Sequence, residues 1–286
     1  MKNSALLIVW IEFAFCLSVA AQTSIASSFR FALITDMHLK QNDNHNTINL
    51  RKAVYDINAQ KEIKFVIVAG DVADKGDRAS MLLVKQLLDS LSIPYHIIPG
   101  NHDTRYCPTG TARFDSVFAQ HHFSFTFKNY RFIGFNTGQG NGINSGLVAP
   151  DEMAWIRTQL QQAGTQQPVF TITHFPLLTG QVDNTTEIIQ TLLPYNIQAV
   201  LSGHYHRNAV FNYSGIPGIL TRTLQPDYQG KCGYSIIEIG TEIRFFEKNP
   251  ENPHPILWLT LPLNAKDNKQ SSVNSEQFMV NVATIN

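Results

Sequence analysis

The sequence predicts an α/β fold, because short apolar runs alternate with longer amphipathic stretches from Phe29 onward. This alternation is typical of βαβ units, in which a helix connects two parallel strands. After Ile219 the pattern changes to strands separated by glycine and proline, which indicates a partly antiparallel edge of the sheets. No repeat or second domain is indicated, so we expect residues 29–263 to form one domain.

Strands and helices are assigned from the period of their apolar residues. Arg78–Leu91 is predicted to be a helix because its apolar residues recur at helical spacing. A further helix should begin near Pro150, where Asp151 and Glu152 suit the positive end of a helix dipole. We also predict a helix at Thr47–Gln60 and strands at Phe31–Thr35, Phe65–Ala69, Tyr95–Pro99, Phe132–Asn136, Val169–Thr173, Ala199–Ser202, Tyr234–Ile239, Ile243–Phe246 and Ile256–Leu261.

Both ends of the chain are expected to lie outside this domain. Residues 1–21 resemble a secretory signal peptide, with Lys2 before an apolar run and Ser18-Val19-Ala20 as a cleavage pattern. The apolar run is short for a membrane span, which needs roughly 20 residues. We therefore expect a secreted or periplasmic protein with no span in its mature form, and an uncleaved anchor is the alternative. Residues 264–286 are expected to form a polar tail.

Charge and cysteine content narrow the classes of function. Lysine plus arginine equals aspartate plus glutamate at 22 each, so no basic groove for a nucleic acid is expected. Beyond residues 1–21 two cysteines remain, Cys107 and Cys232, and an exported protein can keep a disulfide. Because spacing alone does not bring them together, two separate thiols are the alternative. Lipidation of Cys16 is not expected, since Phe15 is too large for a lipoprotein signal.

Five of the predicted strands end in polar clusters. The carboxyl ends of strands in an open α/β sheet converge on the crevice where ligands bind. Asp36 and His38 are two residues apart, so in an extended chain both side chains would leave the same side and could chelate one ion. His204 and His206 have the same spacing. A metal site is predicted from Asp36-Met37-His38, Asp71-Val72-Ala73-Asp74, Asn101-His102-Asp103, His174 and His204-Tyr205-His206.

The types of ligand indicate which metals this site would bind. Carboxylates, imidazoles and an amide oxygen suit Fe, Mn, Zn or Co better than Mg or Ca. Seven ligands are too many for one ion and fit two ions that share a bridging carboxylate. Two ions roughly 3.5–4 Å apart can stabilise both the attacking and the departing oxygen of a phosphoryl transfer.

The ordered motifs resemble those of the calcineurin-like metallophosphoesterase family. Its pattern is D-x-H, G-D-x-x-D, G-N-H-[DE], a single H and G-H-x-H, and all five parts occur here in order between residues 29 and 240. The resemblance implies a four-layer α/β/β/α sandwich of two mixed β-sheets flanked by helices. It also implies Asp36, His38 and His206 as ligands of the first metal, Asn101, His174 and His204 as ligands of the second, and Asp71 as the bridge.

Residues next to the ligands receive roles from the same resemblance and from their position. His102 resembles the family's non-ligand histidine, which stabilises the transition state or protonates the leaving oxygen. Asp103 would orient His102 by accepting its other ring N–H. Asp74 is expected to be structural, since loop aspartates commonly bond their own backbone. Arg105 is interpreted either as a contact for the substrate phosphate or as a solvated loop residue.

Several further residues are not among the predicted ligands, and their roles are expected from their position in the chain. His45 follows the first motif and could reach the substrate. Tyr205, between two predicted ligands, should point the other way by strand alternation and serve packing. The remaining histidines, which are His96, His121, His122 and His254, are expected to lie on the surface or to support a ligand without binding the metal.

Together these expectations describe an exported phosphoesterase with a small-molecule phosphate ester as substrate. The resemblance implies hydrolysis by a metal-bridging hydroxide with help from His102. The chain resembles bacterial phosphodiesterases for cyclic nucleotides or glycerophosphodiesters more than protein phosphatases, and export favours extracellular phosphoesters. The alternatives are a phosphomonoesterase or nucleotidase, a protein phosphatase, a non-catalytic scaffold, and a protein whose tail docks a partner. No oligomeric state is predicted.

Overall fold

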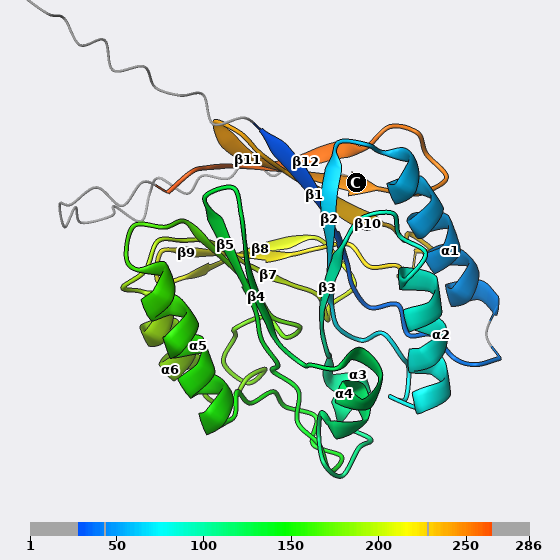
Figure 1. Ribbon diagram of the computed structural model, residues 1–286, viewed down its shortest axis with the longest axis horizontal. Helices are drawn as coiled ribbons and strands as arrows, with labels where there is room; N and C mark the ends of the chain where they lie inside the picture. Colours follow the sequence, from blue (N-terminus) through cyan, green and yellow to red (C-terminus); the bar gives the residue numbers. More distant parts are fainter. Residues whose placement is uncertain (1–27, 43, 228, 265–286) are drawn as a thin grey trace, which may run out of the picture.

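The computed structural model describes residues 28–42, 44–227 and 229–264, in which two six-stranded sheets pack face to face (Figure 1). Helices lie on the outer face of each sheet, so the order of layers is helix, sheet, sheet, helix. The predicted α/β fold with two mixed sheets is confirmed. Residues 1–21 and most of 264–286, for which a signal peptide and a tail are predicted, lie outside the described residues.

The first sheet has the strand order β12-β11-β10-β1-β2-β3. Its parallel half consists of the strands that lead into the first three motifs, and its other half is antiparallel, as the glycine- and proline-rich pattern indicates. Two helices cover its outer face (Figure 1). The elements are β1 (Phe29–Ile34), α1 (Asn44–Ala59), β2 (Ile63–Ala69), α2 (Arg78–Leu88), β3 (Tyr95–Ile98), β10 (Tyr234–Ile239), β11 (Glu242–Lys248) and β12 (Ile256–Pro262).

The second sheet has the strand order β4-β5-β6-β7-β9-β8, with parallel strands in the middle and an antiparallel strand at each edge. Helices α5 and α6 cover its outer face, and the short α3 and α4 lie near the carboxyl end of β3 (Figure 1). The elements are α3 (Asn101–Thr104), α4 (Ala112–Phe118), β4 (Phe123–Phe127), β5 (Tyr130–Gly134), α5 (Pro150–Ala163), β6 (Val169–Ile172), α6 (Thr185–Leu192), β7 (Ile197–Ser202), β8 (Ala209–Tyr213) and β9 (Ile216–Leu220).

Side-chain alternation in the strands fills three apolar layers. In β1, Phe31 and Leu33 are fully buried between the two sheets, whereas Ala32 and Ile34 pack toward α1 and α2. A third layer lies between the second sheet and α5, where Ile156 and Leu160 are buried. Each buried large side chain of this kind contributes about 1.5–3 kcal/mol. The layers hold the carboxyl ends of the central strands rigidly at one edge of the molecule.

The structure differs from the predicted elements at several points. Strand β4 was missed because it alternates aromatic and polar residues at the sheet edge and is not a continuous apolar run. Strands β8 and β9 and helix α6 were also not predicted, and α2 ends three residues earlier than expected, with Asp89 as its C-cap. Cys107 and Cys232 are both free thiols, as in the second of the two alternatives. Every helix in the described ranges is too short or too polar to span a membrane.

Candidate metal centre

The predicted metal ligands follow β1, β2, β3, β6 and β7 at one edge of the two sheets, and all lie in loops except Asn101, the first residue of α3. Backbone hydrogen bonds hold these loops together. The N–H groups of Asp36 and His38 donate to the carbonyls of Gly70 (3.0 Å) and Asp71 (2.9 Å), and that of Gly203 donates to the carbonyl of His174 (3.2 Å). The five motifs therefore meet at one site.

The backbone at the ligands is left-handed, with φ of +51° at Asp36, +46° at His38, +51° at Asp71, +77° at His204 and +52° at His206. The expectation that both D-x-H and H-x-H are extended chain is wrong. Such a conformation in a non-glycine residue is held only when its surroundings over-determine it, at a cost of order 1–3 kcal/mol each. Five ligand residues share this conformation, so the loops are built to place side chains and not to minimise backbone strain.

The first group of ligands consists of Asp36, His38 and His206. The Nε2 atoms of His38 and His206 are 3.3 Å apart, and Asp36 Oδ1 lies 3.8 Å from the first and 3.3 Å from the second. Ligands at about 2.0–2.2 Å around one tetrahedral ion are separated by roughly 3.3–3.6 Å. The three atoms thus surround a point at which an ion can bind.

The second group consists of Asp71, His174 and His204, whose donor atoms lie within 4.8 Å of one another. Asn101 joins this group, because its Oδ1 lies 3.1 Å from His174 Nε2. Asp71 Oδ2 is 3.2 Å from His174 Nε2 and 3.5 Å from His38 Nε2, so it lies between the two groups. This is the position of a bridging carboxylate.

The pKa shifts of the buried aspartates and of His174 indicate that this site needs positive charge. Burial alone would raise the pKa of Asp71, but His174 and His38 lower it to about 2. Burial would likewise raise the pKa of Asp36, and His174, His206 and His38 hold it well below its usual range. His174 is fully buried, yet the charges of Asp71 and Asp36 raise its pKa to about 10. Two buried carboxylates therefore need a cation between them, which metal ions would supply.

Neighbouring groups orient several ligands. Nδ1 of His174 lies 2.8 Å from the carbonyl of Ala69 and donates to it, so Nε2 is the atom that would bind an ion in place of the proton favoured by its raised pKa. The carboxylate of Asp36 accepts from Thr35 Oγ1 at 2.7 Å and from the N–H of His204 at 3.0 Å. Burial and the charge of His174 lower the pKa of His204 to about 4, so this imidazole is neutral, as a ligand must be.

Two glycines are required where the loops approach one another. A Cβ at Gly100 would lie 2.1 Å from Asp71 Oδ1, and a Cβ at Gly203 would lie 2.1 Å from Thr35 Oγ1. Neither contact is possible between unbonded atoms, and one clash falls on a ligand, Asp71, and the other on Thr35, which bonds the ligand Asp36. The glycines of the motifs therefore allow the loops to pack against the ligands.

His102 and Asp103 do not interact as predicted. Nδ1 of His102 donates to the backbone carbonyl of Asp74 at 2.6 Å. The carboxylate of Asp103 instead accepts the backbone N–H groups of Gly100 (2.9 Å), Ala73 (3.0 Å) and Val72 (3.1 Å). Burial and the charge of Asp71 raise the pKa of Asp103 to about 7. Asp103 thus joins two loops, and the residue that orients the His102 ring is Asp74, to which only a structural role had been assigned.

His102 lies beside the ligands, and one of its ring nitrogens is within 4.8 Å of donor atoms of His38 and Asp74. Its ring is 4.5 Å from that of His38 at an angle of 88°, and the backbone N–H of His102 donates to Asp71 Oδ1 at 2.8 Å. Because Nδ1 is bonded to a carbonyl, Nε2 is the atom available for proton transfer. Burial lowers the pKa of His102. Asp74 also places its carboxylate 3.9 Å from His38 Nδ1, which has no hydrogen-bond partner among the described residues.

The two predicted substrate contacts are placed differently. Arg105 donates to Asn144 Oδ1 (2.6 Å) and to the hydroxyl of Tyr106 (2.7 Å), and its guanidinium lies 4.7 Å from the centre of the Tyr106 ring. It therefore links the two loops around residues 105 and 144. His45 is exposed in the first turn of α1, next to Asn46, whose amide donates to the His38 carbonyl at 3.1 Å.

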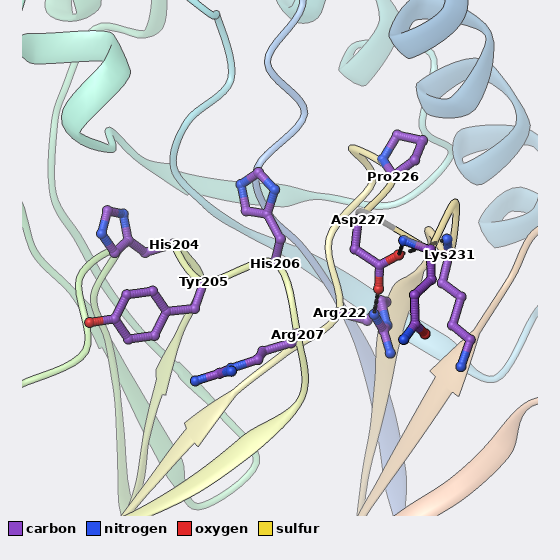
Figure 2. A pocket seen from close by; sticks show the side chains of 9 residues that line it. His204, Tyr205, His206, Arg207, Arg222, Pro226, Asp227 and Lys231 are labelled. Atoms are coloured by element: carbon purple, nitrogen blue, oxygen red, sulfur yellow. Dashed lines mark hydrogen bonds and ion pairs between the residues drawn. The ribbon is translucent and has the colours of Figure 1, made fainter. Parts of the chain in front are cut away.

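A cavity of about 590 Å³ opens beside His204 and His206 (Figure 2). Tyr205 lines it, so the prediction that this side chain points away into the packing is wrong, because residues 203–206 form a loop and not a strand. Figure 2 shows the 204–207 segment on one side of the cavity and the 222–231 segment on the other. Its other lining residues are Arg207, Arg222, Pro226, Asp227, Gln229 and Lys231.

The basic residues of this cavity were not predicted from the sequence. Arg222 is paired, at 2.7 Å from Asp227 and 3.3 Å from Glu247. Arg207 is exposed, and its guanidinium lies 5.8 Å from the centre of the Tyr205 ring. Only Arg207 had a signal that could have been used, because it directly follows the last motif. Lys231 lies in a loop without any recognisable pattern.

This fold and these ligands define a class, the metal-dependent hydrolases that act on phosphate esters. The calcineurin-like phosphoesterase family model matches residues 29–208, and the chain belongs to this family. A probable cyclic nucleotide phosphodiesterase of Vesicomyosocius okutanii is 30% identical over 196 residues, which is 64% of this chain and 81% of that protein. A probable glycerophosphodiester phosphodiesterase of Arcobacter nitrofigilis is 24% identical over 68% of this chain and 78% of its own length. The crystal structure of a dimetal phosphatase from Danio rerio shares the fold, with a TM-score of 0.65 at 15% identity over 82% of this chain and 99% of that one.

Proposed function

We propose that this protein is an exported phosphodiesterase that hydrolyses small phosphate diesters at a two-metal centre. The observation that carries the proposal is the position of Asp71 between two groups of ligands, with His102 beside it. Asp36, His38 and His206 would hold one ion, and Asn101, His174 and His204 the other. The ions, taken to be Fe, Mn, Zn or Co, would supply Lewis acidity to the phosphoryl oxygens and activate a water molecule.

His102 supplies what the metal ligands cannot. Its Nδ1 is committed to the carbonyl of Asp74, so the ring is fixed and Nε2 can carry a proton to the departing alkoxide. Burial lowers the pKa of His102, so its protonated ring is a stronger acid than an ordinary imidazolium. The bond to a main-chain carbonyl holds the ring without adding a charged partner.

The cavity beside the centre supports a diester as substrate. It continues from His204 and His206 to Arg207 and Lys231, so the second ester group can lie along a basic wall. The relatives from Vesicomyosocius okutanii and Arcobacter nitrofigilis are both described as probable phosphodiesterases. Their names agree with a cavity that leaves room for an ester group on each side of the phosphorus.

Export is proposed from the pattern of residues 1–21, and extracellular phosphoesters would then be the substrates. Expression of the full chain, followed by N-terminal sequencing of the exported fraction, tests this point. A new N-terminus after about residue 21 is expected. Intact chains that remain in the membrane fraction would instead support the uncleaved anchor.

The activity is tested with the metal-loaded protein and a panel of phosphate monoesters, linear diesters, cyclic nucleotides and pyrophosphates. We expect the diesters to be hydrolysed with the highest kcat/KM. The Asp71→Ala variant, prepared in parallel, controls for contaminating phosphatases. A preference for monoesters would favour a nucleotidase, and no turnover with two ions bound would favour a non-catalytic scaffold.

A further inference from the structure

A second group of metal-binding side chains lies outside the candidate metal centre. It consists of His121 and His122, in the segment between α4 and β4, and Glu152 in the first turn of α5. One donor atom of each residue lies within 4.8 Å of the others. None of these residues belongs to the motifs of the metal centre.

The distances around Glu152 are those of ligands that share one ion. Its Oε2 lies 2.9 Å from His122 Nδ1 and 3.5 Å from His121 Nε2. Two ligands at about 2.0–2.2 Å from a tetrahedral zinc ion are separated by roughly 3.3–3.6 Å. Only small movements are needed for all three atoms to bind the same ion.

Each of the three side chains is also oriented by a further partner. His121 Nδ1 lies 3.0 Å from both oxygens of the Asp115 carboxylate, so its N–H donates there and Nε2 faces Glu152. The other oxygen of Glu152 accepts the N–H of Asn136 at 3.0 Å. The ring of His122 stacks on Trp155, with centroids 3.9 Å apart and an angle of 11°. A carboxylate behind a histidine ligand is the usual outer partner of zinc sites.

The partial exposure of these three side chains suits an ion that keeps one coordination position open to water. Glu152 is 5% exposed, and both imidazoles keep about a third of their surface in water, at 30% for His121 and 29% for His122. The ion can therefore enter from solvent, and water can complete its coordination. Two imidazoles and one carboxylate suit Zn²⁺ better than Mg²⁺ or Ca²⁺.

We propose that His121, His122 and Glu152 bind one Zn²⁺ ion, separate from the two ions of the hydrolytic centre. The bound ion joins the segment before β4 to the first turn of α5. Because Glu152 also holds the backbone of Asn136, at the carboxyl end of β5, the site stabilises this corner of the second sheet. This site does not depend on the proposed phosphodiesterase activity.

The test counts metal in the full protein. The chain is saturated with Zn²⁺, passed over a desalting column and measured by inductively coupled plasma mass spectrometry. Three ions per chain are expected for the unchanged protein and two for His121→Gln and for His122→Gln. His96→Gln is the matched control, because His96 stacks on Phe125 (3.8 Å, 12°) as His122 does on Trp155. This variant should keep all three ions.

A crystal grown with Zn²⁺ gives a second measurement that needs no variant. An anomalous peak at the zinc edge is expected between the three side chains, at about 2.0–2.2 Å from each ligand atom. The same number of ions in the unchanged protein and in both glutamine variants, or no anomalous peak here while the hydrolytic centre is occupied, would overturn the proposal. A third ion that survives both glutamine substitutions would do so as well. The cluster would then be only a network of hydrogen bonds and ion pairs.

Discussion

The metal centre and the cavity beside it are built in different ways. The ligands come in short motifs, each directly after a buried strand, and five of them have a strained left-handed backbone. The basic side chains of the cavity, Arg207, Arg222 and Lys231, come from two loops that share no motif. Ion binding demands fixed distances, whereas substrate contacts tolerate mobile side chains. Substitutions should therefore have large effects on the first region and modest effects on the second.

Removal of the bridging carboxylate should have the largest effect. In Asp71→Ala both groups of ligands lose the oxygen that lies 3.2 Å from His174 and 3.5 Å from His38. Turnover of bis(p-nitrophenyl) phosphate should fall by more than about 100-fold, because even changes behind a ligand cost 10- to 100-fold. Metal analysis should show ions lost in parallel. Asp183→Ala, at an exposed carboxylate, should match the unchanged protein.

Replacement of His102 separates catalysis from metal binding. In His102→Ala the proton donor is lost while the ligands remain, so kcat should fall about 10²- to 10⁴-fold with both ions retained. Steady-state kinetics and metal analysis of the same sample measure the two effects. If the variant lost its ions, His102 would be a ligand and its assignment as a proton donor would be wrong.

A methyl group at Gly100 tests whether loop packing sets the ligand geometry. The new Cβ would lie 2.1 Å from Asp71 Oδ1, so the bridge must move. We expect metal affinity in Gly100→Ala to fall roughly 10- to 100-fold, as for changes behind a ligand. Competition with a chelator measures it. Gly240→Ala is the control, because its Cβ would meet only the Cβ of Ser28 at 3.6 Å. Equal affinities in the two variants would contradict the account.

The sequence predicts features that depend on neighbouring residues in the chain, and it misses features that depend on contacts between separate loops. The fold class and the meeting of the five motifs were predictable, because buried strands and the polar residues after them are adjacent in the chain. The backbone conformation at Asp36 and His206 was not, since it depends on hydrogen bonds between separate loops. The partner of His102 was missed for the same reason: a main-chain carbonyl, that of Asp74, carries no side-chain signal. The edge strand β4 was missed because its polar face breaks the apolar run.

The smallest expected effect concerns the basic wall of the cavity. Arg207 and Lys231 are exposed, so water and salt screen their attraction for an anionic or polar ester group. Arg207→Ala should raise KM for a diester roughly 3- to 10-fold and leave kcat almost unchanged, because a contact made equally in the ground and transition states changes binding alone. The increase should shrink at high salt. Lys85→Ala, on the outer surface of α2, is the matched control and should change neither constant. A lower kcat in Arg207→Ala with KM unchanged would mean that this side chain acts on the transition state and belongs with the catalytic region, which would remove the distinction between the two regions.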